Sequence, residues 1–144
     1  MNRKLIAMWI VSLAAVMAGA CNPFPRCATE NADATINVAG TYRYVGDKAT
    51  LLRGTITFEQ QGNFVRVVNT TYDNSSDRAL ESAFTPLSGN RLDIVLVPRN
   101  GDTNYRADVT FIFSEDGNSF CVEFSDTNGD AGPLGTYSGL RLPS

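Results

Sequence analysis

Short apolar segments separated by clusters of turn-forming residues restrict the fold of this sequence more than any other feature. From Gly40 onward, segments rich in Val, Ile, Thr, Phe and Tyr are interrupted by pairs such as Asp116-Gly117 and Asn128-Gly129. Such segments are typical of β-strands, and Asp-Gly or Asn-Gly between them is a strong hairpin signal. We predict eight strands, at about 40–46, 50–60, 63–72, 79–86, 90–98, 104–114, 118–125 and 134–142.

Apolar and polar residues alternate within these segments. Leu92, Ile94 and Leu96, for example, fall on one face of a strand, opposite Arg91 and Asp93. Strands with one apolar and one polar face, joined by short turns, indicate an all-β antiparallel up-and-down meander. We expect about eight strands to close into a small barrel, because closure removes exposed sheet edges. A β-sandwich is the alternative, and residues 76–83 are also compatible with one helical turn.

The first twenty residues have the pattern of a secretory signal peptide. Asn2-Arg3-Lys4 is a short positive region, Leu5 to Met17 is an apolar run, and Ala18-Gly19-Ala20 is a small-residue cleavage site. The alternative is a permanent anchor helix, but the apolar run is shorter than the about 20 residues that a membrane span needs. We therefore interpret residues 1–20 as a signal peptide.

Residues 18–21, Ala-Gly-Ala-Cys, resemble the lipobox of bacterial lipoproteins, with Ala18 where Leu is usual. The resemblance implies that Cys21 becomes the lipid-bearing N-terminus and that its acyl chains attach the protein to a membrane. Asn22 stands where enteric lipoproteins kept in the inner membrane carry Asp, so the outer membrane is favoured if the cell is Gram-negative. The expected location is thus the cell envelope.

A change in composition divides the rest of the chain. Residues 21–39 contain Pro23, Pro25 and a polar run over 29–33 without an apolar period, which predicts a flexible tether. Residues 40–144 then form the predicted β-barrel domain, because one domain is what a chain of 144 residues allows.

The two ends of the predicted barrel domain resemble those of lipocalin-like (calycin) barrels. Gly40-Thr41-Tyr42 is similar to the Gly-x-Trp that opens their first strand, and Arg141 stands where an Arg of their last strand packs over that Trp. The resemblance implies that Tyr42 and Arg141 plug one end of the barrel. Residues 111–120 are also similar to the penultimate hairpin of small bacterial lipocalin-like proteins.

Cys27 and Cys121 remain once Cys21 is assigned to the lipid. Export would place them in an oxidising compartment, where paired cysteines are the rule. Cys121 falls on the outward face of its predicted strand, within reach of a tether that runs back along the barrel. We predict a Cys27–Cys121 disulfide, the alternative being two unpaired thiols.

The amino-acid composition argues against several classes of function. The chain has no histidine, the commonest metal ligand and general base near neutral pH, so we expect no metal, no cofactor and no enzyme activity. The formal net charge is −3, and Lys48 is the only lysine after the predicted signal. Nucleic-acid binding needs clustered Lys and Arg, so we expect no nucleic-acid partner.

Nine aromatic residues are predicted to face the barrel interior. An eight-stranded barrel is wide enough either to be filled by its own side chains or to hold one small ligand. Two hypotheses follow, a module that carries a small apolar ligand and a filled barrel that contacts or inhibits another envelope protein. The candidate ligand-lining residues are Tyr42, Phe58, Phe84, Tyr105, Phe111, Phe113, Phe120, Phe124 and Tyr137.

Overall fold

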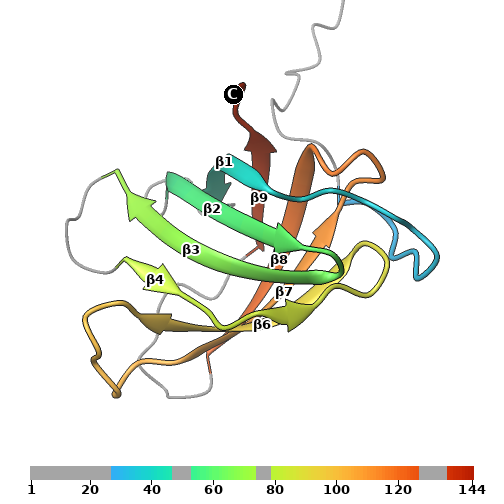
Figure 1. Ribbon diagram of the computed structural model, residues 1–144. Coiled ribbons are helices and arrows are strands. Elements are labelled where there is room, and N and C mark those ends of the chain that lie inside the picture. The colour runs from blue at the N-terminus through green and yellow to red at the C-terminus, as the bar shows by residue number, and fades with distance from the viewer. Residues whose placement is uncertain (1–26, 47–52, 74–78, 127–135) are drawn as a thin grey trace, which may run out of the picture.

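The computed structural model describes residues 27–46, 53–73, 79–126 and 136–144, and these form an all-β structure (Figure 1). All strand pairs are antiparallel. The strands are β1 (Gly40–Gly46), β2 (Arg53–Gln61), β3 (Phe64–Tyr72), β4 (Leu80–Glu81), β5 (Thr85–Pro86), β6 (Arg91–Pro98), β7 (Ala107–Phe113), β8 (Ser119–Asp126) and β9 (Thr136–Arg141).

One curled sheet contains all nine of these strands, in the order β4-β6-β7-β8-β9-β1-β2-β3-β5. Strands that follow one another along the chain are neighbours in this order, apart from the two short strands at its ends, and β9 returns to pair with β1. Figure 1 shows the sheet curling into a half-barrel. The predicted all-β up-and-down meander is therefore confirmed, and the curled sheet agrees with a lipocalin-like barrel rather than with two facing sheets.

The predicted strand at 79–86 was wrong, because this segment forms two separate pieces. Leu80–Glu81 pairs with β6, whereas Thr85–Pro86 pairs with β3. Between them, Ser82 forms hydrogen bonds with both backbone groups of Val67 in β3. The Ser82 N–H donates to the Val67 carbonyl (2.9 Å), and the Ser82 Oγ accepts from the Val67 N–H (2.8 Å). Residues 79–87 thus form a seam between β3 and β6, in which hydroxyls replace part of the backbone ladder.

A β-bulge between β2 and β3 places one of the hydroxyls of this seam. The register shifts at Thr57 and Phe58, which are paired with Asn69 and Val67, so one residue of β3 is extra. Because of that extra residue, Thr70 is buried at 5% exposure, and its Oγ1 accepts from the Leu80 N–H at 2.8 Å. The bulge therefore leaves one residue of β3 out of the β2–β3 pairing and turns the Thr70 side chain inward, where it bonds to Leu80 across the seam.

The core lies inside the curl, where the alternation predicted it. Buried side chains include Ile56 and Phe58 of β2 and Leu92, Ile94 and Leu96 of β6, all at 4% exposure or less. Ile36 (8%) and Val38 (0%) belong to the same core. These two residues lie in the segment predicted to be a flexible tether, so that prediction does not hold for the described residues that precede β1, which pack against the sheet.

Candidate functional site

Five aromatic side chains pack against one another at the end of the barrel where β1 begins and β9 ends, which we call the closed end. Each is 3% exposed or less, and the ring centroids of contacting pairs lie 5.1–6.1 Å apart. Most of these pairs are edge-to-face, the geometry that aromatic quadrupoles prefer. The five are Tyr42, Phe58, Phe111, Phe113 and Phe120, which were predicted to line a ligand and here contact each other.

Gly139 of β9 makes this packing feasible. It is paired with Phe120 in the register, and a Cβ built on Gly139 would lie 2.3 Å from an atom of the Phe120 ring. No other residue type leaves room for the ring at this position, because real Cβ contacts do not come so close.

Tyr42 and Arg141 lie together at the closed end, as the resemblance to lipocalin-like barrels led us to expect. The Tyr42 hydroxyl donates to the Gly117 carbonyl and accepts from Arg141 Nη2 (2.8 Å) and Nε (3.1 Å). The guanidinium carbon lies 5.3 Å from the centroid of the Tyr42 ring, a cation–π distance. Burial raises the pKa of Tyr42, and the neighbouring Arg141 partly offsets that rise.

Residues 29–38, which we call the cap segment, run across the closed end. Gln60 acts as a clip on them: its Oε1 accepts from the Val38 N–H (2.8 Å), and its Nε2 donates to the Ile36 carbonyl (3.1 Å). Arg141 Nη2 donates to the Asn37 carbonyl as well. The cap segment is therefore fixed by side chains of β2 and β9 in addition to its buried Ile36 and Val38.

Asn90 fixes the other end of the cap segment. Its side chain is completely buried; its Oδ1 accepts from the Asn31 N–H (2.6 Å), and its Nδ2 donates to the carbonyls of Thr29 (2.9 Å) and Phe113 (2.8 Å). Its own N–H also donates to the Asn31 carbonyl (3.1 Å). A buried amide with all these partners adds stability, whereas an unpaired one would reduce it. From the sequence, Asn90 was only the first residue of the predicted strand at 90–98.

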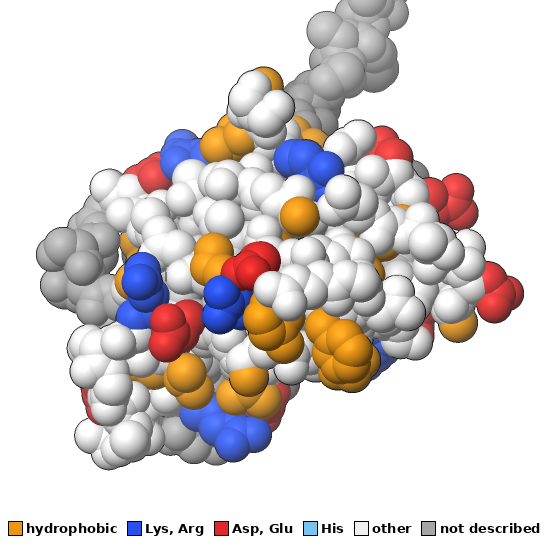
Figure 2. Space-filling model, viewed as in Figure 1, with side chains coloured by type: hydrophobic (Ala, Val, Ile, Leu, Met, Phe, Trp, Pro, Cys, Tyr) orange, Lys and Arg blue, Asp and Glu red, His pale blue; other side chains and the backbone are white. Residues whose placement is uncertain are grey.

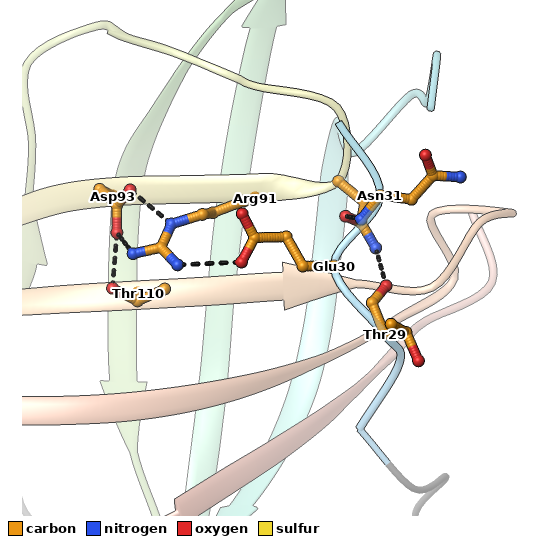
Figure 3. A network of polar contacts seen from close by, with 7 residues as sticks. Thr29, Glu30, Asn31, Arg91, Asp93 and Thr110 are labelled. Carbon is orange, nitrogen blue, oxygen red and sulfur yellow. Dashed lines mark hydrogen bonds and ion pairs between the residues drawn. The ribbon is translucent and has the colours of Figure 1, made fainter. Parts of the chain in front are cut away.

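A polar network on the outer surface continues this attachment (Figure 3). Arg91 forms an ion pair with Glu30 of the cap segment (3.1 Å) and another with Asp93 (2.7 Å), whose carboxylate also accepts from Thr110 Oγ1 (2.6 Å). The hydrogen bonds from Arg91 lower the pKa of Asp93. Because these groups are exposed, the network orients the cap segment more than it stabilises the fold.

The predicted disulfide between Cys27 and Cys121 is present, with the two Cα atoms 5.1 Å apart. It joins residues that are 94 positions apart in the sequence. Cys121 is the third residue of β8 and is paired with Ile112 of β7 and Ser138 of β9. The bridge therefore attaches the chain in front of the cap segment to the outer wall of the barrel.

Tyrosines gather at the opposite end of the barrel, which we call the mouth. The Tyr44 ring lies edge-on to the rings of Tyr72 (6.4 Å) and Tyr137 (6.3 Å), and its hydroxyl donates to the Thr71 carbonyl (3.0 Å). Gly54 leaves room for this hydroxyl, since a Cβ there would lie 2.8 Å from it and closer still to Thr71. Burial raises the pKa of Tyr44 far above its ordinary value.

The remaining predicted site residues lie in different places: some in the interior, one on the surface, and one outside the described residues. Tyr105 packs, partly buried, against the core. Phe84, predicted to face inward, is 36% exposed and lies on the outside, because the seam is not a continuous strand. Phe124 is paired with Val109. Cys21 lies outside the described residues, as does the predicted signal peptide.

An apolar patch lies on the outer surface over β3 and β5. Phe64 is 51% exposed and is paired with Pro86, and Arg66 covers the Phe84 ring at 4.8 Å while it forms an ion pair with Glu59 (2.6 Å). Figure 2 shows hydrophobic side chains gathered beside basic and acidic ones on this face. We call Phe64, Phe84 and Pro86 the outer patch; sequence reasoning missed it because it assigned Phe84 to the interior.

A hollow of about 610 Å³ lies at the closed end, outside the barrel. Its lining includes Gly40, Thr41, Asn118, Arg141 and Leu142. Beside this hollow, Nε and Nη2 of Arg141 donate to Tyr42, Asn37 and Gly117.

Among the described residues, no three Asp, Glu or Cys side chains come together as a metal site would require. In the same part of the chain, no helix has the length and apolar character to cross a membrane.

No protein-family model, curated protein or solved structure matches this chain.

Proposed function

We propose that this protein is a lipid-anchored binding module of the bacterial cell envelope, which holds a small apolar ligand at the mouth of its barrel. The observation that carries the proposal is the difference between the two ends. Tyr42, four phenylalanine rings and the cap segment occupy the closed end, whereas Tyr44 and Tyr137 lie toward the mouth, on the end of the sheet that also carries Gly54, Leu96 and Ala107. A ligand would therefore bind at the mouth.

The signal-like residues 1–20 and the lipobox-like Cys21 support the envelope location. The Cys27–Cys121 disulfide supports it independently, because disulfides persist in exported proteins and are rare in a reducing cytosol. Acylation of Cys21 would hold the domain at the membrane surface, and two or more acyl chains are needed for a stable anchor.

Tyrosine suits the binding of small apolar ligands. Its ring offers a flat apolar surface with few rotatable bonds, and its hydroxyl can fix the orientation of a polar group on the ligand. Tyr44, Tyr72 and Tyr137 come from three different strands and present such rings to one another at the mouth. A flat, mostly apolar molecule would fit this chemistry best.

Native mass spectrometry of the processed domain, produced in the periplasm with Cys21→Ser, tests the ligand. A reproducible added mass that disappears on extraction with organic solvent would establish a carried molecule and its class. A bare mass, lighter by two hydrogens for the disulfide, would contradict the carrier proposal.

Matched variants locate the site. Tyr137→Ala should reduce the occupied fraction, because it removes one ring of the mouth, whereas Phe64→Ala on the outer patch should leave it unchanged. The chain has one tryptophan, Trp9, within the predicted signal. Tyrosine fluorescence of the processed domain therefore reports on rebinding without interference.

The outer patch favours a second candidate function, contact with another envelope protein. Exposed Phe, with Arg stacked beside it, is the composition that protein interfaces favour. A photo-crosslinking amino acid in place of Phe84 should then give a discrete protein adduct in cells, and the same group in place of Asn63 near the hairpin tip should give less. Equal labelling at both positions would contradict this function.

A further inference from the structure

Arg141 carries a positive charge that no carboxylate of the described residues balances. Five other arginines in these ranges form ion pairs with Asp or Glu. Every acceptor bonded to Arg141, in contrast, is neutral: the Tyr42 hydroxyl and the carbonyls of Asn37 and Gly117. Arg141 is also half-buried, and an unbalanced charge that is partly removed from water favours an anionic partner.

One part of the Arg141 guanidinium is held and another part is available. Nε and Nη2 share one edge of the planar group and make all of the hydrogen bonds just described, so Nη1 points away from that edge. Within the described ranges, no acceptor bonds to Nη1. A Cβ built on Gly40 would lie 3.8 Å from Cγ, Cδ and Nε of Arg141, so the backbone of β1 packs along the side chain. The guanidinium is therefore fixed in position while the N–H donors of Nη1 remain free.

The hollow at the closed end lies beside this group. Its volume of about 610 Å³ falls in the range of small-molecule sites, about 300–1,000 Å³. Among its lining residues, all of which are described, Arg141 alone has a charged side chain. Asn118 adds a second donor, because its Nδ2 donates to Asp116 Oδ2 (3.1 Å) and an amide nitrogen has another N–H. Two donors thus adjoin one hollow.

The rest of the hollow is largely apolar. Ala39, Leu142 and Pro143 contribute to its lining, and Leu142 is 41% exposed, which is unusual for a large apolar side chain. Ligand sites typically combine such a surface with a few polar groups that fix the orientation of the ligand. An anionic group attached to a small apolar body would match both parts of this lining.

We propose that the hollow at the closed end is a second binding site, which takes a small organic carboxylate. Nη1 of Arg141 and Nδ2 of Asn118 donate to the carboxylate, and Leu142 and Pro143 contact the apolar body. A phosphate would bring more negative charge toward Asp116, which adjoins Asn118, and has more acceptor oxygens than these donors serve. The site lies at the opposite end from the mouth and depends neither on the proposed ligand there nor on the lipid.

Titration of the processed domain with octanoate, followed by NMR, tests the site. The ¹⁵N-labelled, oxidised chain from residue 21 onward with Cys21→Ser contains every described contact. Octanoate should cause saturable shifts in the amides of Gly117 and Leu142 and in the side-chain signals of Asn118 and Arg141. Octanol, which has the same chain without the charge, should bind about tenfold more weakly, because charge-assisted hydrogen bonds are the stronger ones.

A matched pair of variants tests the role of charge without disturbing the bonds between Arg141 and Tyr42. Leu142→Glu places a negative charge in the hollow and should weaken octanoate binding at least about tenfold, whereas Leu142→Gln, of the same size, should retain most of it. Leu142 is exposed, so both variants should fold, and the shifts of the buried Phe113 amide check this.

Equal binding of octanoate and octanol, or equal loss in the two Leu142 variants, would overturn the carboxylate site. Shifts confined to Gly54 and Tyr137 would also overturn it, since they would place octanoate at the mouth. Conversely, shifts at Gly117 and Leu142 that persist in Tyr137→Ala would support this site whether or not the mouth binds a ligand. The two proposals can therefore fail separately.

Discussion

Asn90 joins three parts of the molecule through one amide. It connects the cap segment, the start of β6 and the end of β7 by hydrogen bonds to Thr29, Asn31 and Phe113. Asn90→Ala leaves several buried polar groups without partners, so we expect a loss of about 2–3 kcal/mol in the free energy of unfolding. Urea denaturation of the oxidised domain measures this change.

Asn63→Ala is the matched control, because Asn63 lies in an exposed hairpin turn and its backbone carbonyl alone bonds to Leu87. The control should change the free energy of unfolding by less than about 0.5 kcal/mol. Similar losses in the two variants would mean that the buried amide is not what holds the cap segment.

The raised pKa values of Tyr42 and Tyr44 should lower the free energy of unfolding at alkaline pH. Burial raises both pKa values above the ordinary value of 10.0, so above that pH the unfolded chain loses tyrosine protons that the folded chain keeps. The free energy of unfolding should be unaffected by these groups below pH 10.0 and then fall, by about 1.4 kcal/mol per pH unit for each tyrosine. Urea titrations at increasing pH measure the slope, and Tyr44→Phe should make it shallower; an unchanged slope in that variant would be evidence against the assignment.

At the residue scale, individual contacts could be predicted only where a family resemblance or the faces of a strand pointed to them. The proximity of Tyr42 and Arg141 was expected from a resemblance, and the Cys27–Cys121 pair from export and strand faces. The roles of Asn90 and Gln60 could not be predicted, because each depends on a cap segment that lies far away in the sequence. An Asn after Gly89 is an ordinary turn residue until its side chain is seen to be buried.

The disulfide has its main energetic effect at the scale of the elements it links. It closes a loop of 94 positions, and the loss of such a closure costs about 2–5 kcal/mol in the free energy of unfolding. Cys27→Ser together with Cys121→Ser should show this loss in urea denaturation. Adding a reductant to the double variant should then change nothing, while it should destabilise the parent domain; a reductant effect that persists in the variant would point to another cause.

The seam offers a separate test, at Ser82. Ser82→Ala keeps the backbone bond to the Val67 carbonyl but removes the acceptor of the buried Val67 N–H. We expect a loss of about 1–3 kcal/mol in the free energy of unfolding and faster amide exchange at Val67. Ser88→Ala, on the exposed turn that follows, is the control, and exchange at Val67 as slow as in the parent would contradict the proposed contact.

At the element scale, the sequence predicted most strands but not the seam or the cap segment. The long strands follow from alternation, which directly records burial on one face. Residues 79–86 contain Leu80, Phe84 and strand-forming Thr85, but nothing local shows that Ser82 takes the place of a ladder group. Residues 33–39 contain two buried side chains, too few for a period, so their packing could not be distinguished from a tether.

The two ends of the whole molecule should differ in local stability. The closed end has five rings in contact and a cap segment held by Gln60, while the ring contacts at the mouth are those of three tyrosines. Amides of Ile112 and Phe113 should therefore exchange only through global unfolding, and those of Val45 and Arg53 through smaller openings. Hydrogen-exchange mass spectrometry at several urea concentrations separates the two cases; uniform protection along β1 and β7 would contradict it.

At this scale, the all-β meander was predictable because every strand carries the same two-faced pattern. The gathering of Tyr42 and four phenylalanines at one end, and of Tyr44, Tyr72 and Tyr137 at the other, was not, because it depends on strand register, which alternation alone leaves open. Tyr44, Tyr72 and Tyr137 are far apart in the sequence and come together only once β9 pairs with β1 and β2 with β3.

The seam also has a consequence for how this architecture can vary. In a barrel closed by a full ladder, the circumference is set by the number of strands and their stagger. Here, residues 79–87 join β3 to β6 through two short pairings and two hydroxyls, so the circumference depends on the length of that one segment. Insertions there would change the circumference without adding a full strand, which makes the seam the natural place for the width of such a barrel to vary.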